Sequence, residues 1–139
     1  MTTIAYLDGV FAYDSRITSG GDIITDKYQK KQIRGGVTFL LAGCVPDFEP
    51  FMQAYLAGCK VSGLNVRAFV VKTSSITQAT ACDDEMWESP VHKGEPMAIG
   101  SGAAHAVTAM DCGLSPVEAV RMAMKRDSCT GGTIRTFKV

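Results

Sequence analysis

The sequence has little of what marks a nucleic-acid-binding, membrane-inserted or secreted protein. Its 14 lysine and arginine residues balance 14 aspartate and glutamate residues, so no excess charge favours nucleic acid or an anionic membrane. No apolar run approaches the roughly 20 residues that a membrane-spanning helix needs, and the first residues lack the pattern of a secretory signal. We therefore predict a cytoplasmic protein with neither a nucleic-acid nor a membrane partner.

The cysteines form no pattern that is typical of a disulfide framework or a zinc site. Their number is odd, they are widely spaced and no CxxC occurs: Cys44, Cys59, Cys82, Cys112 and Cys129. We expect reduced thiols that serve in packing. The two histidines have no evident partner either, and we expect His105 to be packed within a helix of small residues.

Pairs of strands joined by short turns dominate the predicted elements. The 139 residues are enough for one domain, residues 1–139, with a substantial core. No alternation of strand, helix and strand is evident, which argues against a parallel sheet. We therefore predict an α+β fold in which antiparallel sheets pack with helices in layers.

The first predicted hairpin turns at Asp8-Gly9, the dipeptide signal that most strongly favours a two-residue turn. Continuing its ladder places Thr3 opposite Asp14 and Thr2 opposite Ser15. The turn alone thus brings the start of the chain beside an Asp-Ser-Arg cluster. An ordinary hairpin with a polar end is the simpler interpretation of this stretch.

A second predicted hairpin joins residues 30–34 to residues 37–42 through Gly35-Gly36, which can adopt positive φ at both positions. The second of these strands is largely apolar and is expected to be covered on both faces. Between the two hairpins, residues 17–22 are expected to form a turn-rich loop.

The rest of the chain contains three predicted helices and several strands. A stripe of residues at helical spacing follows Asp47 and is expected to face the core: Phe48, Phe51, Met52, Tyr55, Leu56 and Cys59. Ser115 opens a capping box before another helix. The other predictions are strands at 66–72, 75–82, 97–99 and 133–139, a helix at 103–110 capped by Ser101, and an irregular segment at 86–96 with Trp87 packed.

Thr2 would carry a free α-amine once Met1 is removed, and an initial Met before a small residue is normally clipped. An N-terminal Thr combines a nucleophilic hydroxyl and a base in one residue. Such a site also needs an ammonium near the nucleophile, a carboxylate that holds it and an N–H for the oxyanion. The two hairpins offer these candidates: Asp14, Lys30 or Lys31, and Gly43.

Several stretches occur in an order that resembles a known family. They are Thr2-Thr3-Ile4, Asp14-Ser15-Arg16-Ile17-Thr18 with Gly20 and Gln29-Lys30-Lys31, Leu41-Ala42-Gly43-Cys44-Val45-Pro46-Asp47, Gly100-Ser101-Gly102, and Arg126-Asp127-Ser128-Cys129-Thr130-Gly131-Gly132. Together they resemble the β-subunits of the proteasome and the bacterial HslV-type peptidase, within the N-terminal-nucleophile hydrolases. The resemblance implies a four-layer αββα sandwich and a threonine-type endopeptidase.

The resemblance also implies the site residues. The catalytic set would be Thr2, Asp14, Lys30, Gly43, Ser101, Asp127 and Thr130, with Lys31 one residue away as the alternative lysine. Substrate contacts would come from Ile17, Thr18, Tyr28, Leu41 and Val45. Thr18 would hold an extended substrate through its backbone, and the uncharged side chains of the other four predict apolar or aromatic residues before the cut. No cofactor is required, although backbone carbonyls of Met124, Asp127 and Thr130 would suit a weakly bound structural cation.

The sequence also departs from the family pattern. The first hairpin is shorter, Cys44 replaces a glycine, and only six residues separate Cys59 from Val66 where the family has a second long helix. We therefore expect one helix to be missing. The resemblance further implies a ring-shaped homo-oligomer, peptide or unfolded-protein substrates and an ATP-dependent unfoldase. The alternatives are a small-molecule amide hydrolase of the same fold and a catalytically silent, ring-forming subunit.

Overall fold

The computed structural model describes residues 2–139, so Met1 and its expected removal lie outside the described residues. The chain forms two compact units. The first unit comprises residues 2–30 and His92–Val139, and the second unit comprises Lys31–Val91. No helix within residues 2–139 is both long and apolar enough to cross a bilayer.

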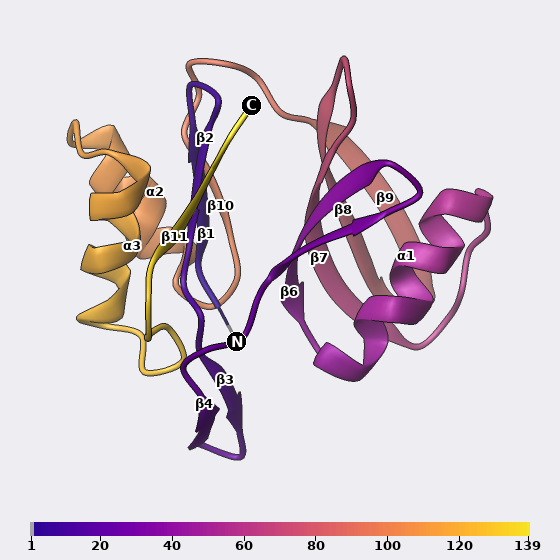
Figure 1. The fold of residues 1–139 in the computed structure, drawn as a ribbon, viewed down its shortest axis with the longest axis horizontal. Helices are drawn as coiled ribbons and strands as arrows, with labels where there is room; N and C mark the ends of the chain where they lie inside the picture. The colour runs from indigo at the N-terminus through magenta and orange to yellow at the C-terminus, as the bar shows by residue number, and fades with distance from the viewer. Residues whose placement is uncertain (1) are drawn as a thin grey trace. The chain divides into compact units, whose positions relative to one another are not determined.

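The first unit contains a four-stranded antiparallel sheet that is covered by two helices (Figure 1). The strand order is β10 (Met97–Ile99), β1 (Ile4–Leu7), β2 (Val10–Tyr13) and β11 (Arg135–Lys138). The helices are α2 (Ala103–Asp111) and α3 (Pro116–Met124). Their shared core with the sheet consists mostly of small side chains: Ala5, Ala12, Ala106, Ala109, Met110, Ala119 and Val120. Small residues let these helices approach the sheet closely.

The first hairpin has the predicted register. Leu7 pairs with Val10, and the Asp14 N–H donates to the Thr3 carbonyl at 3.3 Å beyond the last pair of the ladder. Asp8 and Gly9 have φ values of 50° and 82°, as a type I′ turn requires. This turn therefore brings the residues just before β1 next to those just after β2.

The prediction of a loop at residues 17–22 is wrong. The segment forms β3 (Ile17–Ser19), which pairs with β4 (Asp22–Thr25) in a separate two-stranded sheet. Gly20 and Gly21 have φ values of 57° and 89°, so they make the two-residue turn of this hairpin. The strands are too short for their alternation to stand out from the turn residues around them.

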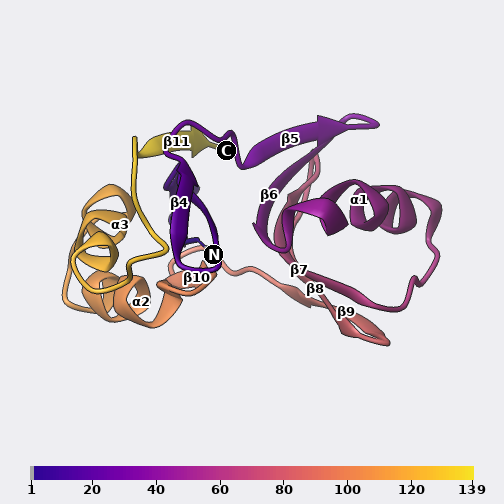
Figure 2. The same ribbon diagram turned by 90° about the horizontal axis from the view of Figure 1, so that it is seen from below.

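The second unit contains a five-stranded antiparallel sheet with one helix, α1 (Phe48–Ala57), along it (Figure 2). The strands follow chain order: β5 (Lys31–Arg34), β6 (Val37–Gly43), β7 (Leu64–Val71), β8 (Ile76–Asp83) and β9 (Glu85–Pro90). A 3₁₀ turn, η1 (Val45–Asp47), leads into α1. Phe51 and Tyr55 of α1 each meet the ring of Phe39 edge-on.

Several predictions for the second unit need correction. Residues 86–90 of the segment expected to be irregular lie in β9, because Asp83 adopts φ 54° and closes a two-residue turn after β8. Trp87 on this strand is 49% exposed rather than packed. Leu56 and Cys59 are also exposed rather than core, since α1 ends at Gly58 in the left-handed conformation.

The cysteines and His105 differ from expectation as well. All five thiols are free, but four are exposed and Cys129 is half-buried, so they are not packing residues. His105 is exposed on α2. The capping box at Ser115 is confirmed, whereas α2 begins after Gly102 without a side-chain cap from Ser101.

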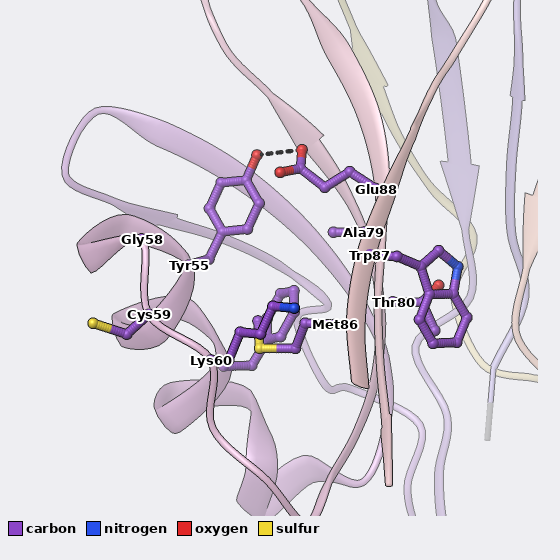
Figure 3. A pocket seen from close by; sticks show the side chains of 10 residues that line it. Tyr55, Gly58, Cys59, Lys60, Ala79, Thr80, Met86, Trp87 and Glu88 are labelled. Atoms are coloured by element: carbon purple, nitrogen blue, oxygen red, sulfur yellow. Dashed lines mark hydrogen bonds between the residues drawn. The ribbon is translucent and has the colours of Figure 1, made fainter. Parts of the chain in front are cut away.

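A pocket in the second unit lies where α1 faces β8 and β9 (Figure 3). The Tyr55 hydroxyl donates to Glu88 Oε2 at 2.9 Å across it. The indole of Trp87 points away from this hydrogen bond, as Figure 3 shows. The pocket contains none of the predicted catalytic residues.

Candidate active site

Three polar side chains meet at the open ends of the first hairpin. Thr2 precedes β1 and Asp14 follows β2, so the Asp8-Gly9 turn brings these two residues together. Lys30 precedes β5 and joins them after the chain has passed through β3 and β4. The Thr2 hydroxyl donates to Asp14 Oδ1 and accepts from Lys30 Nζ. Lys30 Nζ also pairs with Asp14 Oδ1 at 2.6 Å. The structure thus joins the predicted nucleophile, carboxylate and ammonium, with Lys30 as the lysine that contacts both.

Burial makes this cluster electrostatically demanding. Thr2 and Lys30 are each 1% exposed and Asp14 is fully buried. Burial lowers the pKa of the Lys30 ammonium from its ordinary value, and the adjacent Asp14 carboxylate only partly opposes this shift. Removing either partner of such a buried ion pair strongly destabilises the fold, because the other partner is left as an uncompensated buried charge.

Backbone N–H groups hold the Asp14 carboxylate in place. Its Oδ1 atom accepts from the Thr3 N–H at 3.1 Å. Its Oδ2 atom accepts from the N–H groups of Arg16 at 3.2 Å and Gly131 at 2.9 Å. These three N–H groups all donate to the Asp14 carboxylate, and together they fix the orientation of the carboxylate toward Lys30.

A second polar cluster, centred on Asp127, lies beside Thr2 and Thr3. Asp127 Oδ2 accepts from the hydroxyls of Ser101 and Thr130, both at 2.6 Å, and Asp127 Oδ1 accepts from the Cys129 N–H at 3.1 Å. Burial raises the pKa of Asp127, but these hydrogen bonds outweigh it and the net shift is downward. The cluster therefore keeps a negative charge close to the start of the chain.

Ser101 and Thr130 connect this carboxylate to the first two described residues. Ser101 Oγ lies 3.4 Å from the Thr2 carbonyl oxygen. Thr130 Oγ1 lies 2.7 Å from Thr3 Oγ1. Because Thr130 has one hydroxyl proton and gives it to Asp127, Thr3 is the donor in the contact between the two threonines.

Two glycines explain why the Gly-Ser-Gly stretch has its composition. A Cβ at Gly102 would overlap the Thr3 hydroxyl, and one at Gly100, whose φ is 100°, would overlap the Thr2 carbonyl. Both positions therefore need glycine so that the start of the chain can lie against this loop. Thr3 was missed as a site residue by sequence reasoning, although its position opposite Asp14 in the hairpin was available as a signal.

The remaining predicted contacts are distributed over both units. Ile17 and Thr18 lie on β3 and are half-buried, as is Tyr28. A hydrogen bond with Thr18 lowers the pKa of the Cys129 thiol. In the second unit, Leu41 is fully buried in β6 and Val45 opens η1. Their roles in substrate binding stay predictions.

Gly43, the predicted oxyanion donor, is the last residue of β6. Its φ is 121°, and a Cβ there would overlap the Asn65 carbonyl of the neighbouring strand. The positive φ and the close approach of β7, both features of the second unit, therefore require glycine at this position. The use of its N–H for an oxyanion stays a prediction.

The suggested cation site also stays a prediction. Of its three carbonyls, that of Asp127 accepts the Thr130 N–H at 3.1 Å. Among residues 2–139, no group of three or more His, Cys, Asp or Glu side chains is placed to hold a metal ion.

Comparisons with known proteins show the fold. No family model matches the sequence, and no curated protein matches it. The chain is similar to the structure of BPH from Thiobacillus denitrificans in complex with epoxomicin, with a TM-score of 0.68 and 17% identity over 99% of this chain and 97% of that one. It is also similar to eukaryotic HslV from Trypanosoma brucei, with a TM-score of 0.71 and 14% identity over 99% of each chain.

The chain has the N-terminal-nucleophile hydrolase fold. The expected α+β class with antiparallel sheets is confirmed, and α1 is the one α-helix within residues 31–91, in line with a missing second helix. The second of these structures is an HslV, the type of peptidase that the sequence motifs resemble. At such low identity, the likeness concerns the fold, and the chemistry has to be argued from this chain's own residues.

Proposed function

We propose that this protein is a threonine-type endopeptidase whose nucleophile is Thr2, exposed as the first residue by removal of Met1. The observation that carries the proposal is the position of the Thr2 hydroxyl between the Asp14 carboxylate and the Lys30 ammonium, both buried. A hydroxyl is a weak nucleophile unless a base and a nearby positive charge activate it. An ordinary polar hairpin end has no need of a fully buried ion pair around a threonine.

The reaction follows from these groups. The free α-amine of Thr2 accepts the proton of its own hydroxyl while Oγ1 attacks the carbonyl carbon of the scissile peptide bond. The Lys30 ammonium stabilises negative charge that develops on Oγ1, and Asp14 holds that ammonium. The Gly43 N–H would meet the oxyanion.

Collapse of this intermediate completes the cycle. The C–N bond breaks, the amine leaving group takes the proton from the α-ammonium, and an ester links the acyl group to Thr2. Water, deprotonated by the same amine, then attacks the ester and releases the acid. No cofactor enters either step.

The second polar cluster suits the task of orienting the terminal amine. Ser101, held by Asp127, contacts the Thr2 carbonyl, so it sits beside the residue whose amine must point at its own hydroxyl. Thr130 and Thr3 form a second link between Asp127 and the same backbone. These contacts support a role for Ser101, Asp127 and Thr130 in positioning rather than in bond making.

Assembly and substrate are part of the proposal. A peptide or unfolded segment would lie along Thr18, Gly43 and Val45 as an added strand. Ile17, Tyr28, Leu41 and Val45 favour an apolar or aromatic residue before the cut. A homo-oligomeric ring in the cytoplasm would admit only unfolded substrates to the site. An ATP-dependent unfoldase would supply such substrates, and a structural cation would bind the loop carbonyls.

The decisive experiment combines mass and activity. Intact mass of protein purified from its native host should lack Met1, and an apolar fluorogenic peptide should be cleaved. Thr2→Ala should abolish cleavage and Thr2→Ser should retain part of it, whereas Thr136→Ala, an exposed threonine of β11, should change nothing. Retained Met1, or undiminished turnover by Thr2→Ala, would sink the proposal.

The same experiment separates the alternatives. A small-molecule amide hydrolase would cleave simple amides but leave peptides intact, with the same dependence on Thr2. A silent ring-forming subunit would assemble, as native mass spectrometry reports, and cleave neither.

A further inference from the structure

Gly131 is a glycine for an unusual reason. Its φ is not positive, so the backbone alone would accept alanine. A Cβ at Gly131 would instead overlap the guanidinium of Arg16, whose Cζ, Nε and Nη2 atoms are its three nearest neighbours. The guanidinium therefore lies directly against the Gly131 backbone.

Three hydrogen bonds hold this guanidinium in position. Arg16 Nε and Nη2 donate to the two oxygens of Asp26, at 2.8 and 3.2 Å, and Nη1 donates to the Ser128 carbonyl at 3.0 Å. The paired geometry orients the planar group as well as binding it. The hydrogen bond with Asp26 raises the pKa of Arg16 and lowers that of Asp26, so the pair is charged over the working range of pH.

Gly131 in turn touches the candidate active site. Its N–H donates to Asp14 Oδ2 at 2.9 Å, and its carbonyl accepts the Ser15 N–H at 3.0 Å. The backbone N–H of Arg16 donates to the same Asp14 oxygen at 3.2 Å. Arg16 thus reaches Asp14 by two routes, directly through its backbone and indirectly through the peptide that its side chain covers.

Stability alone gives a weak reason for this arrangement. The side chains of Arg16 and Asp26 are 20% and 42% exposed, and ion pairs as exposed as this one contribute little to stability. The ion pair matters instead because it places the Arg16 guanidinium against the Gly131 peptide.

We propose that Arg16 is a positioning residue for the Thr2 site. Its guanidinium, oriented by Asp26, packs against the Gly131 peptide and keeps the Gly131 N–H on the Asp14 carboxylate that orients Lys30 and Thr2. Gly132 fits the same arrangement, since a Cβ there would meet the backbone of Asp26. The kinetic test of this inference rests on the proposed peptidase function, whereas a second test, amide exchange of the Gly131 N–H, needs no activity.

The kinetic test is a double-mutant cycle between Arg16 and Gly131. Arg16→Ala should lower kcat about tenfold with KM within about twofold of wild type, because misplacing a catalytic group affects the bound state. Gly131→Ala should cost at least as much, because its methyl group displaces the guanidinium. Arg16→Ala/Gly131→Ala should be no worse than Arg16→Ala, since the methyl group then has room.

The matched control is Arg34→Ala, which removes an exposed arginine that pairs with Glu49 in the second unit. It should leave kcat and KM unchanged. Asp26→Asn keeps one side-chain acceptor and should fall between wild type and Arg16→Ala in kcat. Additive effects of the two changes in the cycle would overturn the inference.

Amide exchange measured by NMR tests the inference without any activity. The Gly131 N–H should exchange about tenfold faster in Arg16→Ala than in wild type, while core amides of β1 and β2 keep their rates. Unchanged Gly131 exchange would sink the positioning role even if peptides are cleaved. If wild type cleaves no peptide but Arg16→Ala still shows the faster exchange, the peptidase proposal fails and the positioning role stands.

Discussion

The two units bury different kinds of side chain. Among the described residues, the first unit buries six polar or charged ones, whereas the second buries Thr80 alone: the six are Thr2, Thr3, Asp14, Ser15, Lys30 and Thr130. The core of the second unit is built from large apolar groups such as Phe39, Phe51 and Phe69, all fully buried. The first unit also buries the rings of Phe11 and Tyr13, but it joins its sheet to its helices through alanine-rich contacts.

This difference assigns separate tasks to the two units. Burying charge costs free energy unless every group is paired and hydrogen-bonded, and the first unit satisfies that condition around Asp14. The second unit obtains stability from aromatic packing and places few demands on polar partners. Substitutions in the first unit should therefore affect chemistry most, and those in the second unit should affect folding most.

The largest effect is expected for Lys30→Met. If the first unit tolerated this change, the division of tasks between the two units would be wrong. Peptide cleavage should fall by at least about a hundredfold, and the free energy of unfolding should drop by about 3–5 kcal/mol, because Asp14 stays buried without its counter-charge. Urea unfolding and a fluorogenic peptide measure the two losses. Lys27→Met, at an exposed position, should match wild type in both.

Phe51→Ala should have the opposite profile. Removing this fully buried ring from α1 should cost about 3–5 kcal/mol of unfolding free energy, while the folded fraction keeps its kcat. Leu56→Ala on the same helix is the control, since Leu56 is 44% exposed and should cost far less. A large loss of kcat in fully folded Phe51→Ala would contradict the division of tasks.

The dependence of stability on pH should also come from the first unit. Burial lowers the pKa of Lys30 below its ordinary 10.5, so between the two pKa values the unfolded chain binds more protons at this residue. Stability from Lys30 should then rise with pH up to about 10.5, by at most about 1.4 kcal/mol per pH unit. The unfolding free energy of wild type minus that of Lys30→Met should show this rise as the pH approaches 10.5, and a difference that stays flat up to pH 10.5 would contradict it.

The smallest effect is expected at the capping box of α3. Ser115→Ala removes the acceptor of the Glu118 N–H and should cost about 1 kcal/mol. Thermal unfolding should show a modest decrease in Tm, with peptide cleavage unchanged. Ser75→Ala, an exposed serine of the second unit, serves as the reference. Loss of activity beyond the loss of folded protein would show that α3 contributes more to the site than packing.

Local signals explain what the sequence predicted well. The Asp8-Gly9 turn places Thr3 beside Asp14 because hairpin register depends only on the residues in the turn. The capping box before α3 is equally local. The choice of Lys30 over Lys31 came instead from the family resemblance, and Lys30 is the lysine whose Nζ meets Thr2 and Asp14 in the structure.

The features that escaped prediction depend on contacts between distant residues. Arg16 meets Ser128 and lies against Gly131, and no periodicity in either stretch encodes that contact. The exposure of Trp87 follows from the edge position of β9, which depends on the pairing of the whole sheet. The hairpin of β3 and β4 was missed because its Gly-Gly turn is equally typical of a loop.

The order of these contacts along the chain has a consequence for synthesis. Thr2, Asp14 and Lys30 all leave the ribosome early, yet the N–H that fixes Asp14 belongs to Gly131, and Thr3 waits for Thr130. At about 5–20 residues per second, the intervening hundred or so residues take about 5–20 seconds to make. During that interval the hairpin lacks its supporting loop. If the proposed function holds, peptide cleavage would therefore begin only after residues 130 and 131 have been made and have reached the hairpin.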